Sequence, residues 1–306
     1  MKKLYFNQNN IKPSNSLKRA WRWQKNRLTT KKDLSYVVPQ AEKKEIEFLN
    51  QNRTDFSLTW IGHSTFLIQI NGLNILTDPV WSKKMGFGKR LSEPGLTFEQ
   101  LPEIDIVLIS HNHYDHLSFW SIKQLKGNPM FILPEGLGTL FKKKGLQPYM
   151  ELPWWESTNI KNTKITMVPA QHWSKRSLRD TNQSHWGGYI LSFEEEVVYF
   201  AGDSGYFPGF KEIGEKFSID YALLPIGAYE PEYFMHIQHT TPEEAIQAFL
   251  DLNAKTFIPM HYGAFRLADD TPKEGLDRFN NEWNRLQLPE EKRIVLTLGE
   301  THKKDV

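Results

Sequence analysis

Residues 106–118 read I-V-L-I-S-H-N-H-Y-D-H-L-S, an apolar run followed by a dense group of potential metal ligands. The run from Ile106 to Ile109 predicts a buried strand, because four apolar β-formers end in a polar cluster. Within the next positions come three histidines and an aspartate: His111, His113, Asp115 and His116. Open α/β sheets place their sites at the carboxyl ends of strands, so this spacing indicates a metal site at the end of a central strand.

Length and composition restrict the remaining possibilities. The 306 residues suffice for one large α/β domain with a sizeable core. The chain has no cysteine, which excludes disulfides, thiolate ligands and cysteine nucleophiles. Any metal must therefore be held by imidazole and carboxylate, a donor set that suits zinc, iron or manganese. No apolar run approaches the roughly 18 residues that span a bilayer, and no apolar signal segment follows Met1, so we expect a cytoplasmic protein.

We expect residues 1–55 to form a basic extension and residues 56–306 to form the catalytic domain. Residues 1–32 hold ten of the 38 Lys and Arg residues and none of the 36 Asp and Glu residues. A short amphipathic helix over 17–28 could touch anionic lipid peripherally, at the inner face of the membrane. The preferred interpretation is an arm that packs Trp21 or Trp23 onto the body while its charges stay solvated.

Hydrophobic periodicity predicts strands separated by helices. Strands are expected over 58–61, 65–70, 73–76, 104–110, 130–133, 164–168, 190–193, 197–201, 221–224, 256–259 and 293–298. Helices are expected over 41–50, 117–125, 136–143, 210–216, 241–252 and 272–286. Asn71-Gly72 predicts a tight hairpin turn, and Thr241 followed by Pro242 predicts a helix start. Residues 83–100 should form a loop over the site. This order predicts an α/β (α+β) protein with two packed sheets covered by helices.

Single ligand candidates follow three later strands, at His172, Asp203 and His261. If the strand ends converge, five histidines and two aspartates can hold two divalent ions. One ion would be bound by His111, His113 and His172, and the other by Asp115, His116 and His261. Asp203 could bridge both ions, since a carboxylate has two oxygens.

Such a pair of cations, about 3.5–4 Å apart, would lower the pKa of a bridging water and make hydroxide available near neutral pH. The hydroxide could attack a phosphoryl or carbonyl group, with Asp115 orienting it or holding its proton. No serine or cysteine nucleophile is needed.

The segment S-H-N-H-Y-D-H-L at 110–117, followed by His172, Gly202-Asp203 and His261, resembles the metallo-β-lactamase superfamily. Other segments are similar to its N-acylphosphatidylethanolamine-hydrolysing phospholipase D branch: W-I-G-H-S-T-F-L at 60–67, T-D-P at 77–79, Q-H-W-S-K-R at 171–176, A-G-D-S-G-Y at 201–206 and Q-H-T-T-P-E-E-A at 238–245. The resemblance implies an αββα four-layer sandwich, two zinc ions and hydrolysis of a phosphodiester that releases a phosphatidic acid.

Other site residues also follow from the resemblance. His239 matches a histidine near the scissile phosphate, where it could bind a phosphate oxygen or protonate the leaving group. The alternative is a histidine with a local hydrogen bond at a helix start. His63 is expected to be a buried, hydrogen-bonded neighbour of the ligands, and Asp78 to orient a ligand histidine. The three remaining histidines carry no positional signal and are expected at the surface: His185, His236 and His302.

The substrate is less specified. Tyr229, Phe234 and Met235 could line an acyl groove beside His239, or could be core or lid packing. Because the arm has no clear apolar insertion segment, a lactonase or ester hydrolase acting on a small phosphorylated substrate is the alternative. The acidic body argues against a nucleic-acid partner, and a homodimer is left open.

Overall fold

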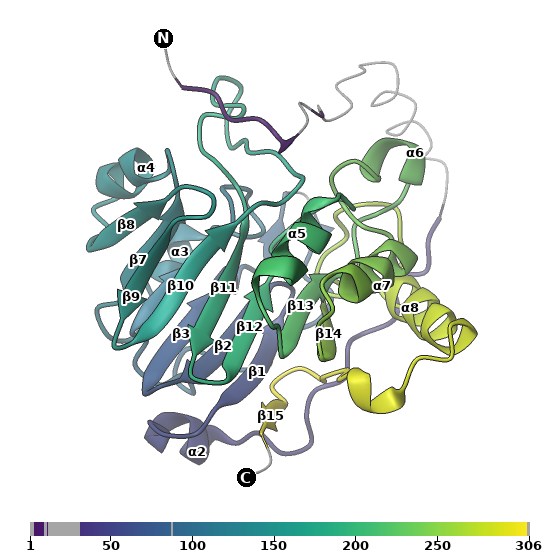
Figure 1. Ribbon diagram of the computed structural model, residues 1–306, viewed down its shortest axis with the longest axis horizontal. Coiled ribbons are helices and arrows are strands. Elements are labelled where there is room, and N and C mark those ends of the chain that lie inside the picture. Colours follow the sequence, from purple (N-terminus) through teal and green to yellow (C-terminus); the bar gives the residue numbers. More distant parts are fainter. Residues whose placement is uncertain (1–2, 9–10, 12–30, 87, 305–306) are drawn as a thin grey trace.

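The computed structural model describes residues 3–8, 11, 31–86 and 88–304, and it shows two packed sheets flanked by helices (Figure 1). The expected αββα arrangement is confirmed. The predicted helix over 17–28 lies outside the described residues. No helix among the described residues is long and apolar enough to cross a membrane.

The first sheet has seven strands, in the order β15 (Thr301–Lys303), β1 (Ser57–Gly62), β2 (Thr65–Ile70), β3 (Leu73–Thr77), β6 (Ile106–Leu108), β7 (Met130–Pro134) and β8 (Tyr149–Leu152). The strands from β3 to β8 are parallel to one another. The predicted central strand is shorter than expected but lies within this parallel group, between β3 and β7. The hairpin turn at Asn71-Gly72 is present, with positive φ at both residues.

The second sheet has six strands, in the order β14 (Thr256–Met260), β13 (Tyr221–Pro225), β12 (Glu196–Phe200), β11 (Gly188–Phe193), β10 (Thr163–Val168) and β9 (Ser157–Ile160). A small hairpin of β4 (Lys84–Met85) and β5 (Gly88–Lys89) lies in the segment expected to be a loop. The parallel strands β12, β13 and β14 run in the same direction as β10, because β11 is antiparallel to both β10 and β12. Four carboxyl ends therefore meet at one edge of this sheet.

Helices cover the outer faces of the sandwich. They are α2 (Ile46–Gln51), α3 (Phe119–Ile122), α4 (Gly138–Lys143), α5 (Gly209–Lys216), α6 (Glu232–Met235), α7 (Pro242–Asp251) and α8 (Glu274–Arg285), with a 3₁₀ turn at Glu290–Lys292. In Figure 1, α5 and α7 lie in front of the green strands of the second sheet. The start of α7 is fixed by a capping box, in which Thr241 and Glu244 each accept the other's backbone N–H.

The two faces of the first sheet belong to two cores. Along β2, the side chains of Phe66, Ile68 and Ile70 join the large core that includes the second sheet. Leu67 points the other way and joins a second core with Ile122 of α3 and Phe141 of α4. This alternation follows from the two-residue period of a strand, and burial of both faces makes every residue of β2 inaccessible.

The predicted strand over 293–298 is wrong. Among the described residues, this segment makes only isolated bridges, from Arg293 to Phe257 and from Leu298 to Gln40. The last strand is instead β15, which pairs with the free edge of β1. Besides β15 and the β4–β5 hairpin, the sequence did not predict β8 and β9, because both are short and largely solvent-facing and so lack an apolar pattern.

Candidate metal centre

The ends of five strands bring the predicted ligands to one edge of the sandwich. Asp78 follows β3, and residues 110–116 follow β6 in the first sheet. In the second sheet, His172 follows β10, Asp203 follows β12 and His261 follows β14. Because the carboxyl ends of parallel strands share one edge, residues nearly 200 positions apart become neighbours.

One group of donors consists of His111, His113 and His172. The Nδ1 atom of His113 lies 2.9 Å from His111 Nε2 and 3.2 Å from His172 Nε2. Three imidazole nitrogens thus face a common centre. Bare lone pairs would repel there, so this arrangement fits a shared cation.

The second group contains Asp115, His116 and His261. His116 Nε2 lies 3.2 Å from His261 Nε2, and Asp115 Oδ2 lies 3.4 Å and 3.6 Å from these two nitrogens. All of these side chains are buried except that of Asp115, which is 13% exposed. The donor set of the second predicted ion is therefore also assembled.

Asp203 lies between the two groups, as the bridging prediction requires. Its Oδ1 is 3.1 Å from His261 Nε2, whereas its Oδ2 is 3.1 Å from His116 Nε2 and 3.9 Å from His172 Nε2. Oδ1 is fully buried yet has no hydrogen-bond partner among the described residues. Its contact with His261 thus lacks hydrogen-bond geometry, and a cation at this position would satisfy the buried oxygen.

The rear nitrogens of three ligand rings are held by hydrogen bonds. Asp78 Oδ2 lies 2.7 Å from His116 Nδ1, as predicted for an orienting carboxylate. Ser110 Oγ lies 2.9 Å from His111 Nδ1, and the Gln238 carbonyl lies 2.8 Å from His172 Nδ1. Such contacts fix the tautomer that leaves the other nitrogen free to bind metal.

His63 lies beside Asp115. Its Nε2 is 3.1 Å from Asp115 Oδ2, and its ring centroid is 4.0 Å from that of His261. The side chain is buried, and the backbone has a φ of 56°, an uncommon value for a residue with a side chain. These contacts fit the predicted hydrogen-bonded neighbour of the ligands.

Burial and neighbouring charges shift the pKa values of the donor side chains in different directions. Burial lowers the pKa of His113 to about 3 and that of His172 to about 4, so both rings are neutral at pH 7 and keep a lone pair. Burial alone would raise the pKa of Asp203, but His116 and His261 outweigh it and hold that pKa well below its usual range. Against the effect of burial, Asp203 and Asp115 raise the pKa of His116 well above its usual range and that of His261 to about 9, so a cation that binds at these two rings would displace their protons.

A groove of about 1770 Å³ opens over these residues. Asp115, Asp203 and His239 lie in its floor, and the predicted Phe234 and Met235 are among its lining residues. His239 Nδ1 is 3.8 Å from Asp203 Oδ2 and has no hydrogen-bond partner in the described part of the chain. The local hydrogen bond considered for the His239 ring is therefore not formed through Nδ1.

Tyr229 does not line the groove, so that prediction is wrong. Its ring is fully buried, its hydroxyl lies 3.2 Å from Glu274 Oε1, and the Arg278 guanidinium stacks on it at 4.6 Å. Both contact residues belong to α8, and sequence alone did not indicate this packing. The interpretation of Tyr229 as core packing, left open above, holds.

The expectation that His185 lies at the surface is also wrong. It is buried rather than at the surface, packed between Tyr5 and Trp154 at centroid distances of 4.6 Å and 4.1 Å. His236 is exposed as expected, and His302 is half-buried. Isolated histidines carry no periodic signal, so their burial depends on tertiary contacts alone.

Arg176 was quoted only as part of a motif, yet it supports the metal-binding loop directly. Its Nη1 donates to the carbonyls of Asn112 and Leu117 at 2.8 Å, and to that of His113 at 3.3 Å. Its guanidinium also stacks on the Tyr114 ring at 4.0 Å. The sequence does not predict this role of Arg176, because its partners are backbone carbonyls in the loop after a different strand.

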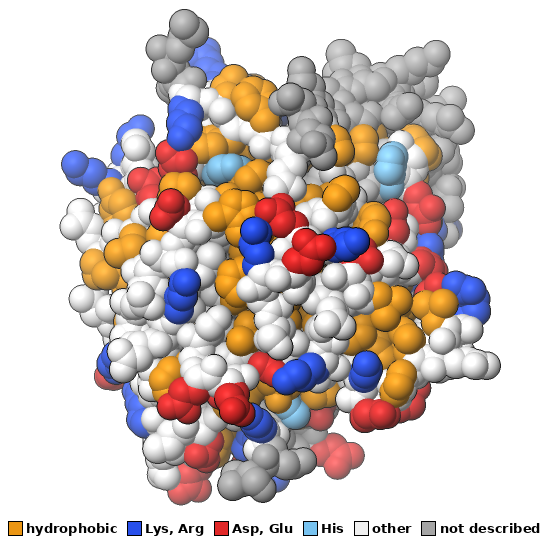
Figure 2. All heavy atoms as spheres, viewed as in Figure 1, with side chains coloured by type: hydrophobic (Ala, Val, Ile, Leu, Met, Phe, Trp, Pro, Cys, Tyr) orange, Lys and Arg blue, Asp and Glu red, His pale blue; other side chains and the backbone are white. Residues whose placement is uncertain are grey.

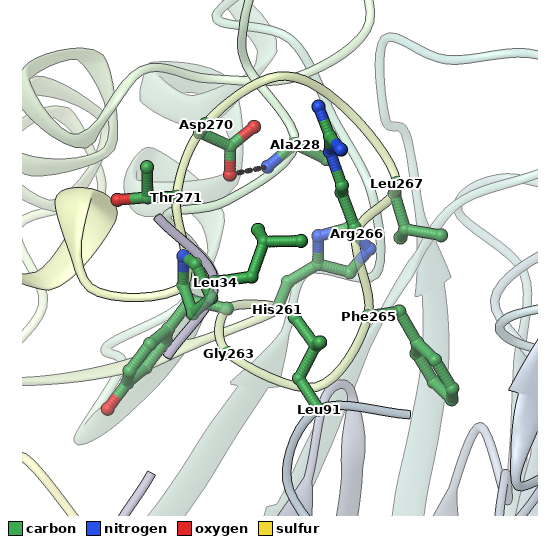
Figure 3. A pocket seen from close by; sticks show the side chains of 12 residues that line it. Leu34, Leu91, Ala228, His261, Gly263, Phe265, Arg266, Leu267, Asp270 and Thr271 are labelled. Carbon is green, nitrogen blue, oxygen red and sulfur yellow. Dashed lines mark hydrogen bonds between the residues drawn. The ribbon is translucent and has the colours of Figure 1, made fainter. Parts of the chain in front are cut away.

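His261 also lines a small cavity that holds none of the other donors among its lining residues (Figure 3). Asp270 and Arg266 lie on its wall together with Leu34. One oxygen of Asp270 accepts the Ala228 N–H at 3.0 Å. His261 Nδ1 has no partner among the described residues. No hydrogen bond to Nδ1 therefore fixes the orientation of this ring, unlike that of His116.

Comparisons with known proteins agree with this geometry. A family model described as a beta-lactamase superfamily domain matches residues 73–262. An N-acyl-phosphatidylethanolamine-hydrolyzing phospholipase D of Caenorhabditis elegans is 38% identical over 68% of this chain and 64% of the relative. Its mitochondrial namesake in Saccharomyces cerevisiae is 37% identical over 74% of this chain and 52% of the relative. The match thus spans between about half and two thirds of these relatives.

Two further matches cover nearly the whole of the other protein. A metal-dependent hydrolase of Methanopyrus kandleri is 32% identical over 81% of this chain and 99% of the relative. The solved structure of Igni18, a metallo hydrolase of Ignicoccus hospitalis, has a TM-score of 0.61 at 24% identity, over 83% of this chain and 100% of that one, and supports the fold alone. The chain therefore belongs to the metallo-β-lactamase superfamily, in the branch of the N-acylphosphatidylethanolamine-hydrolysing phospholipase D proteins.

Proposed function

We propose that this chain is a hydrolase that binds two divalent cations and cleaves a phosphodiester of an anionic lipid. The observation that carries the proposal is the position of Asp203. Its Oδ1 lies 3.1 Å from His261 Nε2, and its Oδ2 lies 3.1 Å from His116 Nε2 in the same donor group and 3.9 Å from His172 Nε2 in the other. A carboxylate between two sets of imidazoles is suited to two neighbouring ions.

The donor chemistry favours Zn²⁺, with Fe or Mn as alternatives. Each donor group is rich in imidazole, and carboxylate supplies the remaining ligands without any thiolate. Nitrogen-rich sites of this kind suit zinc and its neighbours better than Mg²⁺ or Ca²⁺, which prefer oxygen alone. When bound, the two cations supply a water of lowered pKa and positive charge next to the substrate oxygens.

The residues of the chain perform the remaining steps. Asp115 is close to His63 and ionised because His116 outweighs the effect of burial on its pKa, so it can accept a hydrogen bond from the attacking water and orient it. His239 lies in the groove floor beside Asp203 and can contact a phosphate oxygen or the leaving group. Burial lowers the pKa of His239 well below its usual range, so in the free protein it is a neutral hydrogen-bonding group.

The groove favours a substrate with both an anionic group and an apolar chain. Its apolar lining includes Trp120, Trp173 and Phe234, and its cations include Lys84 and Lys175. The only carboxylates among its described lining residues are the two in the metal centre, Asp115 and Asp203. Together with the names of the nematode and yeast relatives, this lining supports N-acyl phosphatidylethanolamine as the substrate.

A peripheral membrane contact is part of this proposal. Leu178 at 93% exposure and Trp120 at 55% lie at the groove together with basic side chains. Apolar side chains beside Lys and Arg are suited to an anionic lipid surface. The segment expected to make this contact, residues 1–32, falls largely outside the described residues.

A small phosphorylated lactone or ester is the alternative substrate. The cations Lys84, Lys89 and Lys175 would bind a free phosphate group as well as a lipid phosphodiester. A nucleic acid is not favoured, since the face in Figure 2 intermixes basic and acidic side chains rather than presenting one basic surface.

The proposal is tested by metal content together with a substrate panel. Asp203→Asn and His111→Ala should reduce bound Zn²⁺ below two ions per chain and lower hydrolysis by at least a hundredfold. His236→Ala changes an exposed histidine of the C-cap of α6 and is the matched control. Release of phosphatidic acid from N-acyl phosphatidylethanolamine supports the lipid substrate, whereas lactone opening without phosphodiester cleavage would establish the alternative. Full activity after metal removal would refute both.

A further inference from the structure

The N-terminal residues 3–8 lie against loops at the metal-binding edge of the second sheet (Figure 1). Tyr5 is 6% exposed and packs with Trp186 and Ala170, and its N–H donates to the Asn182 carbonyl at 2.9 Å. The segment is thus docked by apolar packing and by a backbone hydrogen bond. Nothing in its sequence predicted a contact with the site.

Asn7 is the buried centre of this contact, at 6% exposure. Its Oδ1 accepts the backbone N–H of His172 at 2.9 Å and the indole N–H of Trp186 at 3.1 Å. Its Nδ2 donates to the carbonyl of His172 at 2.9 Å and to that of Ile11 at 3.0 Å. Two accepted and two donated bonds use the full capacity of an amide side chain.

The two bonds to His172 matter because this residue lies beyond the end of β10. Its backbone belongs to no strand ladder, so one side chain satisfies both its N–H and its C=O. Losing the partner of a buried backbone group is costly, and the backbone would shift to recover hydrogen bonds. The position of the His172 ring depends on that backbone.

Two distant segments therefore set the geometry of His172. The Gln238 carbonyl binds Nδ1 and fixes the tautomer, while Asn7 holds the backbone from which the side chain extends. Nε2 is then directed toward His113, 3.2 Å away. A metal ligand requires both the correct tautomer and the correct position.

We propose that Asn7 is a positioning residue for the ion bound by His111, His113 and His172, so that the N-terminal extension forms part of the metal centre. The proposal rests on the proposed metal site. It predicts that Asn7→Ala weakens one of the two ions selectively, although Asn7 contacts no ion itself. The expected loss in affinity is about tenfold to a hundredfold, the range found when partners of ligand residues are removed.

The test is a titration of the metal-free full-length chain with Zn²⁺ against a chromophoric chelator, which separates two binding steps. His172→Ala identifies the step that depends on His172. Gln8→Ala is the matched control, because the neighbouring residue of the same segment makes a hydrogen bond to Glu212 instead of to the site. Near-UV circular dichroism checks that each variant is folded, and Asn7→Ser, which is too short to reach both backbone groups, replaces Asn7→Ala if the latter does not fold.

The inference holds if Asn7→Ala weakens the His172-dependent step at least tenfold while the other step and the Gln8→Ala variant stay within twofold. It is overturned if Asn7→Ala lowers the melting temperature but leaves both steps unchanged, since Asn7 would then be structural only. If His172→Ala itself leaves both steps unchanged, the proposed metal site fails, an outcome that is distinct from failure of the inference.

Discussion

Asp78 offers the sharpest test of how the chain prepares a metal ligand. The carboxylate is fully buried and has three partners: Oδ1 accepts the Ser110 N–H at 2.7 Å, and Oδ2 lies 2.5 Å from Ser110 Oγ and 2.7 Å from His116 Nδ1. Asp78→Asn preserves the shape and the acceptor for the Ser110 N–H. It replaces Oδ2 by an NH₂ group, which cannot accept the N–H of His116.

The magnitude follows from the two ways in which His116 can respond. If the ring keeps its tautomer, a buried donor loses its partner, which costs about 1–3 kcal/mol of folding stability. If the proton moves to Nε2, the ring satisfies the new NH₂ group but loses the lone pair that faces the metal. Either way, we expect Zn²⁺ affinity to fall about tenfold to a hundredfold, which is about 1.4–2.7 kcal/mol.

The assay is chelator competition with the loaded protein, combined with thermal unfolding. Asp105→Asn is the control, because Asp105 lies next to the start of β6, at the opposite end from the site, and binds Arg53 and the Asn74 N–H instead of a histidine. An Asp78→Asn protein that binds Zn²⁺ as tightly as the unmodified chain would refute the idea that this carboxylate selects the tautomer of His116.

Three further outcomes are expected. His239→Gln should lower kcat about 10²-fold or more while bound metal stays the same, because we propose that His239 contacts substrate rather than metal; a parallel loss of metal would contradict this. Arg176→Ala should lower both the melting temperature and metal affinity, since three carbonyls of the metal-binding loop lose their donor; Lys123→Ala, which removes an exposed cation at the end of α3, should leave both unchanged. Burial lowers the pKa of His185 to about 3, so below pH 6.5 the unfolded chain gains a proton that the folded chain does not. Folding stability should therefore fall as the pH decreases, by about 2 kcal/mol at pH 5, and equilibrium unfolding of His185→Phe should show a shallower slope; equal slopes would remove His185 as the cause.

Local patterns in the sequence were sufficient for most of the sandwich. The apolar run at 106–109, the Asn71-Gly72 turn and the start of α7 at Thr241 are determined by neighbouring residues, and each was predicted from them. The segment 293–298 shows the limit of this reasoning. It has the apolar content of a strand, but strand formation requires a partner, and the edge of β1 is occupied by β15 instead.

The site likewise has features that local sequence predicts and features that depend on tertiary contacts. The sequence by itself determined the types of the donors and their places after strands, because dense histidine and aspartate spacing is a local property. Only the tertiary structure decided which oxygen of Asp203 faces which histidine, that Tyr229 points into the core, and that Asn7 and Arg176 hold the ligand loops. These contacts join segments far apart in the chain through backbone groups, and a backbone carbonyl or N–H looks the same at every position in a sequence.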